Sequence, residues 1–402
     1  MMRISTSQMF TQNTNNILQK QTETAKLLEQ LSSGKKVNTS GDDPVAALGI
    51  DNLNQQQALV DQFLKNIDYA KNHLGIAESK LGSAEELVTG LREQILRGVN
   101  GGLSPSERQM IADEMRGSLQ ELLNVANTRD ESGNFMFSGF KTDTEPFAFD
   151  GAGNMVYSGD AGVRDAMISR GIAMGTNVPG DMAFMTSPNA LGDYTVNYLS
   201  SQAGDFKVQS AAITNPAAHV EDTYTFNFID NGSGGVNLEV RDSANGLVTT
   251  VNNFDATNPV SFNGIDVKLE GTPAAGDSIS LAPQAEVSIF DTINKAIALI
   301  EDDSRMNSPA GIAELAQLLN DTDSGLNQLS TARSVAGNNL KSLESYAGRH
   351  AEEQVVNTSA LSLLEDLDYA TAITEFEKQQ LALNAVSNVF SRVGSVSLFD
   401  YL

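Results

Sequence analysis

Residues 60–95 read VDQFLKNIDYAKNHLGIAESKLGSAEELVTGLREQI, and this stretch decides how the rest of the chain can fold. Its apolar residues recur at alternating steps of three and four, which is the heptad repeat of a coiled-coil helix. The positions that follow this spacing are Val60, Phe63, Ile67, Ala70, Leu74, Ala77, Leu81, Ala84, Val88, Leu91 and Ile95. All of them except the alanines are predicted to form the core of a helical rod.

The start of this helix carries a capping signal. Asp43 stands directly before Pro44, which places a capping side chain ahead of a proline at the first helical position. A helix from Pro44 to about Gly98 would be roughly 80 Å long, at 1.5 Å per residue. This length exceeds the width of an ordinary domain, so part of the molecule is predicted to be a rod. The same signal recurs at 104–105 and 308–309.

A second apolar stripe lies near the other end of the chain, and Arg333 interrupts it. No proline occurs between residues 310 and 402, so the segment can be a long helix. The stripe consists of Leu315, Leu319, Leu326, Leu329, Ala336, Leu340, Leu343 and Ala347. The simplest burial partner of the N-terminal helix is therefore the C-terminal one, which brings both ends of the chain together.

The middle of the chain has a different character. Residues 143–287 contain 18 Asp and Glu against five Lys and Arg, and strand-like alternation replaces the heptads. Apolar residues alternate from Tyr224 to Phe228, a glycine-rich turn follows, and Asn263-Gly264 is a two-residue hairpin turn. Residues 147–157 form a similar pattern. These features predict a β-rich domain with many solvated turns.

Together the patterns predict an α+β fold, mainly a long α-helical coiled-coil rod that is built from both termini, with an inserted β-rich knob domain. We expect residues 43–142 and 288–365 to be the two halves of the rod, and 143–287 to be the inserted, variable domain. Residues 1–42 and 366–402 are predicted to be assembly segments, of which the first is disordered in the monomer.

Composition excludes several classes of function. The chain has 402 residues, with 26 Lys and Arg against 51 Asp and Glu, and its formal net charge is −25. Such an acidic surface repels phosphate backbones and anionic lipids, so neither nucleic-acid nor membrane binding is expected. Cysteine is absent, which excludes disulfides, thiolate metal sites and a cysteine nucleophile. Residues 1–16 are polar and do not resemble a cleavable signal peptide.

No motif points to catalysis. His73, His219 and His350 lack metal-ligand spacing, and we expect them to be surface residues. The Gly-Lys-Lys at 34–36 is a poor match to a phosphate-binding loop, and a calcium loop starting at Asp230 lacks its ligands. We therefore predict a protein that is not an enzyme and has no cofactor and no metal site.

The two ends of the chain are the most informative regions for function. From Ser5 to Thr24, 14 of 20 residues are Ser, Thr, Asn or Gln, so a lone helix of this composition would be marginal in water. Apolar residues are nevertheless spaced as seams at both ends. The predicted assembly interface consists of Ile17, Leu18, Leu28, Leu31, Ile373, Phe376, Leu383, Phe390, Val393, Leu398 and Phe399. We expect these seams to become ordered when neighbouring molecules supply the other half of the interface.

Three segments of the chain resemble the signatures of bacterial flagellin-like proteins. LSSGKKVN at 31–38 and DDPVAA at 42–47 resemble the N-terminal signature, and DLDYA at 366–370 resembles the start of the last helix. Residues 126–147 and the ending SLFDYL at 397–402 are similar to hook–filament junction members of that family. The resemblance covers about 1–147 and 290–402 and says little about the middle domain.

This resemblance implies a structural role in the bacterial flagellum. Family members are exported unfolded through the flagellar type III apparatus, without a cleaved signal, and are secreted to the extracellular flagellum. Junction members form a ring of subunits between hook-associated protein 1 and the first flagellin subunits. A cytoplasmic flagellar export chaperone is expected to hold the C-terminal region before secretion.

Two other functions remain open from the sequence. The first is flagellin, the bulk filament subunit, although the Asp-Tyr-Leu ending argues against it. The second is a coiled-coil adhesin with a glycan-binding β knob, in which Tyr224, Phe226 and Phe228 would be exposed. The alternation of these residues more simply predicts that they line the core of the knob.

Overall fold

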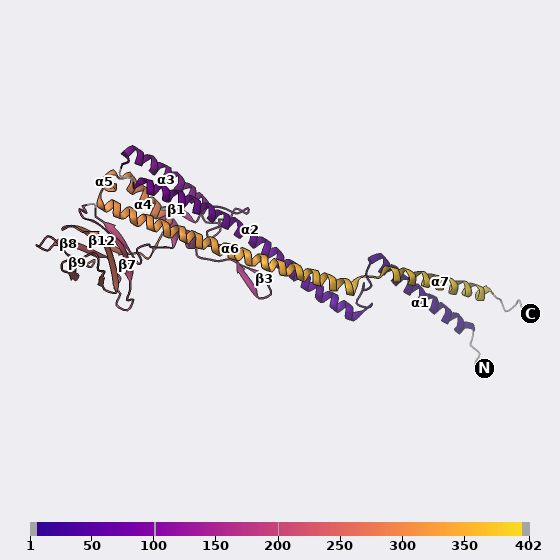
Figure 1. Ribbon diagram of the computed structural model, residues 1–402. Helices are drawn as coiled ribbons and strands as arrows, with labels where there is room; N and C mark the ends of the chain where they lie inside the picture. The colour runs from indigo at the N-terminus through magenta and orange to yellow at the C-terminus, as the bar shows by residue number, and fades with distance from the viewer. Residues whose placement is uncertain (1–5, 100–101, 200, 396–402) are drawn as a thin grey trace, which may run out of the picture. The chain divides into compact units, whose positions relative to one another are not determined.

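The computed structural model describes residues 6–99, 102–199 and 201–395, and it divides into two compact units (Figure 1). The terminal unit comprises residues 1–65 and 346–402, and the central unit comprises residues 66–345. Two long helices, α2 (Pro44–Gly98) and α6 (Pro309–Glu365), contribute to both units. Long helices from both parts of the chain and a β-rich region between them confirm the predicted fold class.

In the central unit, the heptad stripe of α2 is buried. The side chains at its positions there are almost completely removed from solvent: Ile67, Ala70, Leu74, Ala77, Leu81, Ala84, Val88, Leu91 and Ile95. In the terminal unit, Val60 is buried as well, whereas Phe63 is half-buried. The spacing of apolar residues alone therefore indicates which edge of α2 is covered.

The second stripe supplies the facing surface from α6. Its members Leu315, Leu329, Ala336 and Leu343 are buried. Arg333, which interrupts that stripe, forms two ion pairs with α2, to Glu78 at 2.7 Å and to Glu85 at 2.9 Å. A charged residue in the seam is thus accommodated because its partners come from the opposite helix.

Helix α3 (Pro105–Ala126) begins at the cap that the sequence predicts at 104–105, and this cap is a capping box. The Ser104 hydroxyl accepts a hydrogen bond from the Glu107 amide at 3.3 Å, and the Glu107 carboxylate accepts one from the Ser104 amide at 2.8 Å. The caps at Asp43 and Ser308 are confirmed too, since both side chains accept amide hydrogen bonds from the first turn of the following helix.

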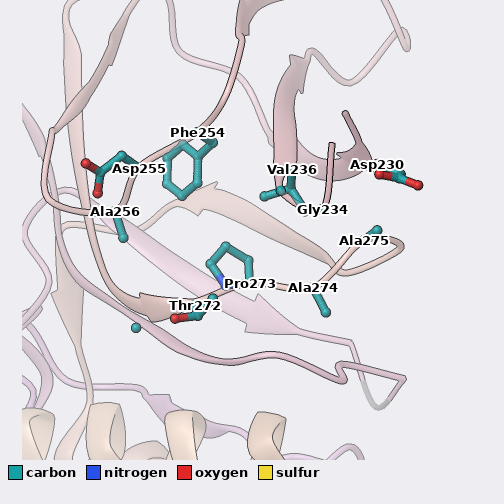
Figure 2. A pocket seen from close by; sticks show the side chains of 12 residues that line it. Asp230, Gly234, Val236, Phe254, Asp255, Ala256, Thr272, Pro273, Ala274 and Ala275 are labelled. Atoms are coloured by element: carbon teal, nitrogen blue, oxygen red, sulfur yellow. The ribbon is translucent and has the colours of Figure 1, made fainter. Parts of the chain in front are cut away.

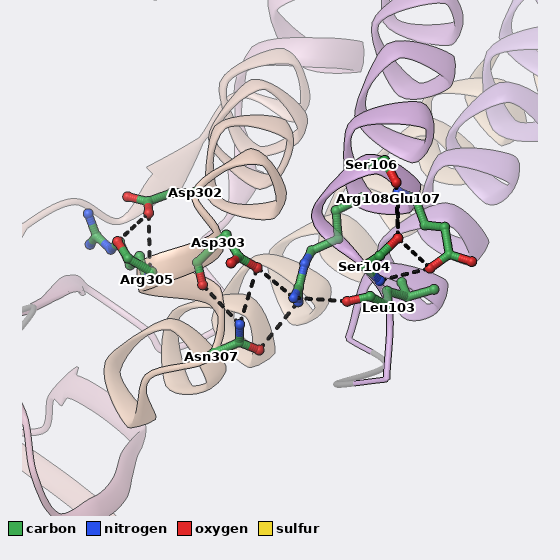
Figure 3. Close-up of polar contacts among 10 residues, drawn as sticks. Leu103, Ser104, Ser106, Glu107, Arg108, Asp302, Asp303, Arg305 and Asn307 are labelled. Carbon is green, nitrogen blue, oxygen red and sulfur yellow. Dashed lines mark hydrogen bonds and ion pairs between the residues drawn. The ribbon is translucent and has the colours of Figure 1, made fainter.

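One turn into α3, Arg108 connects three segments of the central unit (Figure 3). Its guanidinium donates to the carboxylate of Asp303 at 2.6 Å and to the carbonyl oxygen of Leu103 at 3.1 Å. A third, longer bond at 3.4 Å reaches Asn307. Because the side chain of Arg108 is only 5% exposed, this contact fixes α5 (Asp303–Met306) to the start of α3.

Two antiparallel sheets form the β domain of the central unit. The five-stranded sheet has the order β10 (Leu247–Val251), β9 (Val236–Arg241), β8 (Tyr224–Asp230), β13 (Ser278–Pro283) and β6 (Tyr194–Tyr198). The three-stranded sheet has the order β11 (Val260–Phe262), β12 (Ile265–Thr272) and β7 (Asp205–Ile213). The predicted hairpin turn is confirmed between β11 and β12, where Asn263 and Gly264 have φ angles of 42° and 75°.

Tyr224, Phe226 and Phe228 are buried in the core between these sheets, as their alternation predicts. They are therefore not an exposed aromatic surface, which removes the feature on which the adhesin alternative depends. Residues 243–246 form an exposed turn between β9 and β10.

The region predicted as one inserted domain, 143–287, contains one large core and several smaller strand pairs. Its buried core extends only from Leu191 to Leu281 and includes Ala310 and Ala313 from α6. The remaining strands form separate two-stranded pairs: β1 (Phe147–Phe149) with β2 (Met155–Tyr157), β3 (Asp165–Ser169) with β4 (Ile172–Gly175), and β5 (Ser187–Pro188) with β14 (Glu286–Val287). They pack on helices instead: Asn66 of α2 donates to the carbonyl oxygen of Met167 at 2.7 Å.

The remaining helical elements of the central unit lie beside these hairpins. They are η1 (Asp181–Met185) and α4 (Ile289–Glu301). The rings of Phe147, Phe184 and Phe290 pack with centroids 5.4–5.7 Å apart, so β1, η1 and α4 share one aromatic cluster. The predicted hairpin at 147–157 is confirmed by the β1–β2 register.

The expectation that the histidines lie at the surface is wrong for two of them. His73 is buried, and its Nε2 lies 3.2 Å from the guanidinium of Arg164. Burial and this neighbouring positive charge lower the pKa of His73. His350 is buried against Phe63, with ring centroids 5.5 Å apart. Both histidines are thus packing residues, and the contacts that bury them are distant in sequence.

Candidate assembly interface

The terminal unit carries the residues that the sequence singles out for assembly. Helices α1 (Thr6–Ser33) and α7 (Tyr369–Ser395) lie side by side in it (Figure 1). Residues 34–36 follow α1, and residues 363–367 include the end of α6 and precede α7; we call these two short segments the joint. The joint lies between α1 and α2 and between α6 and α7, so it determines where α1 ends and where α7 begins.

The joint is held by hydrogen bonds between segments that are more than 300 residues apart. The amide of Lys36 donates to the carbonyl oxygen of Glu365 at 2.7 Å, and the ammonium of Lys36 donates to the carbonyl oxygen of Leu363 at 2.7 Å. Lys35 forms an ion pair with the Glu365 side chain. The Gly-Lys-Lys triplet therefore connects the end of α1 to the end of α6. This is a structural role, unlike that of a phosphate-binding loop.

Gly34 ends α1 in a conformation that favours glycine. Its φ is +74°, and its carbonyl oxygen accepts a hydrogen bond from the Leu367 amide at 3.0 Å. A Cβ at this position would lie 2.9 Å from the hydroxyl oxygen of Tyr369, at the start of α7. Both the backbone and the neighbouring ring therefore exclude a side chain here.

Ionised carboxylates complete the joint. Asp42 accepts hydrogen bonds from the ammonium of Lys26 at 2.7 Å and from the backbone amides of Asn38 and Thr39. These bonds, above all the one from Lys26, hold the pKa of Asp42 well below its usual range. Asp368 caps α7 by accepting hydrogen bonds from the Thr371 hydroxyl and from the amides of the first turn, and these bonds, above all the one from the hydroxyl, lower its pKa.

The predicted assembly residues divide into three groups in the structure. Leu18, Leu28 and Ile373 are exposed. The half-buried ones are Ile17, Leu31, Phe376 and Leu383. The side chains of Phe390 and Val393, and the residues Leu398 and Phe399, lie outside the described part of the chain.

The two seams are partly covered within one chain. They are predicted to contact neighbouring molecules, and in the structure α1 and α7 also lie along each other. Each helix therefore covers part of the other, and the face that remains open is narrower than the full set of predicted residues. Helix α1 is regular from Thr6 to Ser33 in this structure.

Further apolar residues of the terminal unit are exposed that are not among the predicted assembly residues. They are Phe10, Val45, Leu48, Leu59, Val355, Val356, Leu363, Tyr369, Leu381 and Val389, of which Leu363 and Leu381 are 78% and 74% exposed. An open groove of about 870 Å³ lies on α6 between Ala351 and Leu363. These residues are not part of the heptad stripe of α2 or of the predicted seams. A search for a second apolar stripe on the same helices could have identified them from the sequence.

Large apolar side chains that remain exposed favour association, because contact with another molecule would remove them from water. Burying each one would contribute about 1.5–3 kcal/mol before the entropy of ordering is subtracted. Within the described residues, no group of three or more His, Asp or Glu side chains is arranged to hold a metal ion. No helix in the described part of the chain is both long and apolar enough to span a membrane.

Comparison with known proteins agrees with this picture. Residues 4–142 match the family model of the bacterial flagellin N-terminal helical region. Flagellar hook-associated protein 3 from Escherichia coli is 25% identical over 399 residues, which cover 99% of each chain. The Salmonella typhimurium protein of the same name is 37% identical over 146 residues, or 36% of this chain and 46% of that one.

The fold points the same way. The crystal structure of flagellar hook-associated protein 3 from Legionella pneumophila superposes with a TM-score of 0.69 at 29% identity, and the match covers 78% of this chain and 98% of that one. Over residues 4–142 the chain therefore resembles the N-terminal helical region of bacterial flagellins, and along its whole length it is similar to flagellar hook-associated protein 3.

Proposed function

We propose that the protein is a structural component of the bacterial flagellum, which forms the junction layer between the hook, through hook-associated protein 1, and the flagellin filament. The observation that carries this proposal is the end-to-end similarity to hook-associated protein 3, over 99% of both chains. The exposed apolar residues of the terminal unit support it, because they provide a surface for repeated contacts between subunits.

Assembly would proceed through the terminal helices. A pair of helices without further cover is marginal in water, so α1 and α7 would gain most of their order when neighbouring subunits pack against them. A few apolar side chains for each helix, repeated around a closed ring, would outweigh the entropy of ordering. In this proposal, the assembly role predicted for residues 1–42 and 366–402 means that contact with neighbouring subunits would stabilise α1 and α7.

The remaining partners follow from the same proposal. The protein would contact flagellin on one side of its layer and copies of itself within the layer, and an export chaperone would hold it in the cytoplasm. It would be secreted through the flagellar type III apparatus and function outside the cell. It would act without catalysis and without a cofactor.

The location of the protein on the flagellum tests this proposal. An epitope-tagged copy, expressed in a strain that lacks the gene, would be labelled with immunogold and examined by electron microscopy. A junction protein gives one band of label where hook and filament meet. Label along the whole filament would identify a flagellin instead, and label on the cell surface would favour an adhesin.

A further inference from the structure

A cleft of about 540 Å³ lies in the β domain of the central unit (Figure 2). Its walls come from the end of β8, the start of β9, the segment that follows β10, and the turn between β12 and β13. Nothing in the proposed junction function requires this cleft, so the following inference does not depend on that function.

The middle of the cleft is apolar. The ring of Phe254 packs edge-to-face on Phe228 of the core, with centroids 5.5 Å apart, and stays partly exposed. Figure 2 shows Pro273 facing Phe254 across the cleft, with Val236 and Ala256 beside them. An aromatic ring and a proline ring that face each other provide room for a slender aliphatic chain.

A carboxylate marks each end of the cleft. Figure 2 shows Asp255 at one end and Asp230 at the other. Each accepts a backbone hydrogen bond, from Thr257 at 3.0 Å and from Gly232 at 2.9 Å, and the bond from Thr257 lowers the pKa of Asp255. No Lys, Arg or His lines the cleft, and neither carboxylate forms an ion pair within the described residues.

The walls of the cleft are preformed. The buried carboxylate of Asp277 accepts hydrogen bonds from the amides of Ala203, Gly204 and Ala274, which fix the turn between β12 and β13. Gly271, at φ +100°, passes so close to Asp205 that a Cβ would collide with its carbonyl oxygen. A ligand would therefore meet a rigid site and lose little free energy in ordering it.

We propose that this cleft binds a basic segment of a partner polypeptide. The aliphatic stem of a Lys or Arg side chain would lie between Phe254 and Pro273, and its cationic head would lie beside Asp255 or Asp230. Charge favours this ligand over neutral or anionic ones, since residues 143–287 carry a net charge of −13 that attracts cations.

The full-length protein and a short peptide test the proposal. The probe is acetyl-Gly-Lys-Gly-Lys-Gly-amide, titrated by saturation-transfer NMR, and its control is the same peptide with both lysines acetylated. The variant Asp230→Asn/Asp255→Asn keeps the backbone hydrogen bonds but removes both charges. Its matched control, Asp143→Asn/Asp165→Asn, removes two exposed charges elsewhere in the same region.

We expect the dissociation constant of the lysine peptide to rise about three- to tenfold in the cleft variant and less than twofold in its control. The acetylated peptide should not bind. Equal weakening in the two variants would show diffuse charge attraction and overturn the proposal. Binding of the acetylated peptide or of maltotriose would overturn it as well, because recognition would then not require a cation. Tighter binding of spermidine than of the peptide would identify a free polyamine as the ligand and refute a polypeptide partner.

Discussion

The hydroxyl oxygen of Tyr369 lies 2.9 Å from the point where a side chain on Gly34 would begin. The first residue of α7 thus occupies the space that the residue after α1 leaves empty. This relationship joins the two signature segments of the family, 31–38 and 366–370, in one contact. It gives a physical reason for glycine in the first segment and tyrosine in the second.

Replacing Gly34 by alanine should loosen the joint. A non-glycine residue at φ +74° costs about 1–2 kcal/mol, and the new methyl group would also displace Tyr369. Amide hydrogen exchange at 34–37 and 363–370 should become faster. The control is Gly75→Ala, in the interior of α2 with no atom within 4 Å of the new methyl group, which should stabilise by about 0.5–1 kcal/mol. Unchanged exchange in Gly34→Ala would show that the joint tolerates a side chain.

Exposed apolar residues of α7 should matter for assembly and not for folding. Leu381→Asp places a charge on a side chain that is 74% exposed, so the soluble protein should keep its circular dichroism spectrum and melting temperature. Junction assembly, measured as the gold band at the hook–filament boundary, should be lost. Leu247→Asp is the matched control, because Leu247 is exposed in the β domain and should tolerate the charge in both assays.

Unfolding of the soluble protein by Leu381→Asp would place this residue in the core of the monomer. Loss of the gold band in both variants, with both proteins still exported to the medium, would show that a charge outside the terminal unit also prevents assembly. Either result would contradict an assembly face that is confined to the terminal unit.

Removing the buried guanidinium of Arg108 should destabilise the central unit. Arg108→Ala removes the guanidinium from the carbonyl of Leu103 and leaves Asp303 with the longer hydrogen bond from Asn307, at a cost of about 1–3 kcal/mol in chemical denaturation. The comparison is Arg97→Ala, which breaks an exposed ion pair with Glu114 and should change the free energy of unfolding by less than about 1 kcal/mol. Equal losses in the two variants would mean that burial of Arg108 adds nothing.

The central unit should become less stable as the pH rises through 6. Burial raises the pKa of Asp321 to about 6, against a hydrogen bond from the Ala190 amide and the positive charge of Lys295, which lower it. Because the folded pKa lies above the ordinary value, the fold favours the protonated acid. Its stabilising contribution is present below pH 4 and is lost as the pH rises through about 6. The total change amounts to about 3 kcal/mol.

Asp321→Asn imitates the protonated acid and should remove this dependence. The amide can still accept from Ala190 and can donate towards Gln317, whose side-chain oxygen is buried without a partner one turn earlier on α6. Asp321 lines a cavity in the central unit. The other charged residues that line it are Asp291, Lys295, Arg305 and Glu314. We expect a higher melting temperature at pH 7.5 and a flatter profile between pH 5 and 8. The exposed control Asp165→Asn should leave the profile unchanged, and a lower melting temperature for Asp321→Asn would refute the assignment.

Patterns that are local in sequence predicted the structure well. The heptad from Ile67 to Ile95 is buried because its spacing matches the helix period, whatever the helix packs against. The turn at Asn263-Gly264 was predictable because few other dipeptides adopt positive φ at both positions. The helix caps at Asp43, Ser104 and Ser308 were predictable because each depends on a few neighbouring residues.

Contacts between distant segments could not be predicted in this way. His73 is buried because Arg164 covers it from 91 residues away, and Arg333 fits into a helix seam because two glutamates face it from α2. For the assembly residues the limit is of another kind. Whether Leu18 or Ile373 is covered depends on which neighbouring helix is present. In the structure α7 already covers part of α1, and these two side chains stay exposed.

The meeting of both terminal helices at one joint has a practical consequence for anyone who attaches a reporter to this protein. The proposed assembly surface lies on α1 and α7, the first and last helices. A fluorescent domain or purification tag at either terminus would therefore be attached close to a helix of that surface. The turn at 243–246 is a better site for an insertion, because it is exposed and lies in neither the terminal unit nor the lining of the cleft. An epitope inserted there is the one to use for the gold-labelling experiment.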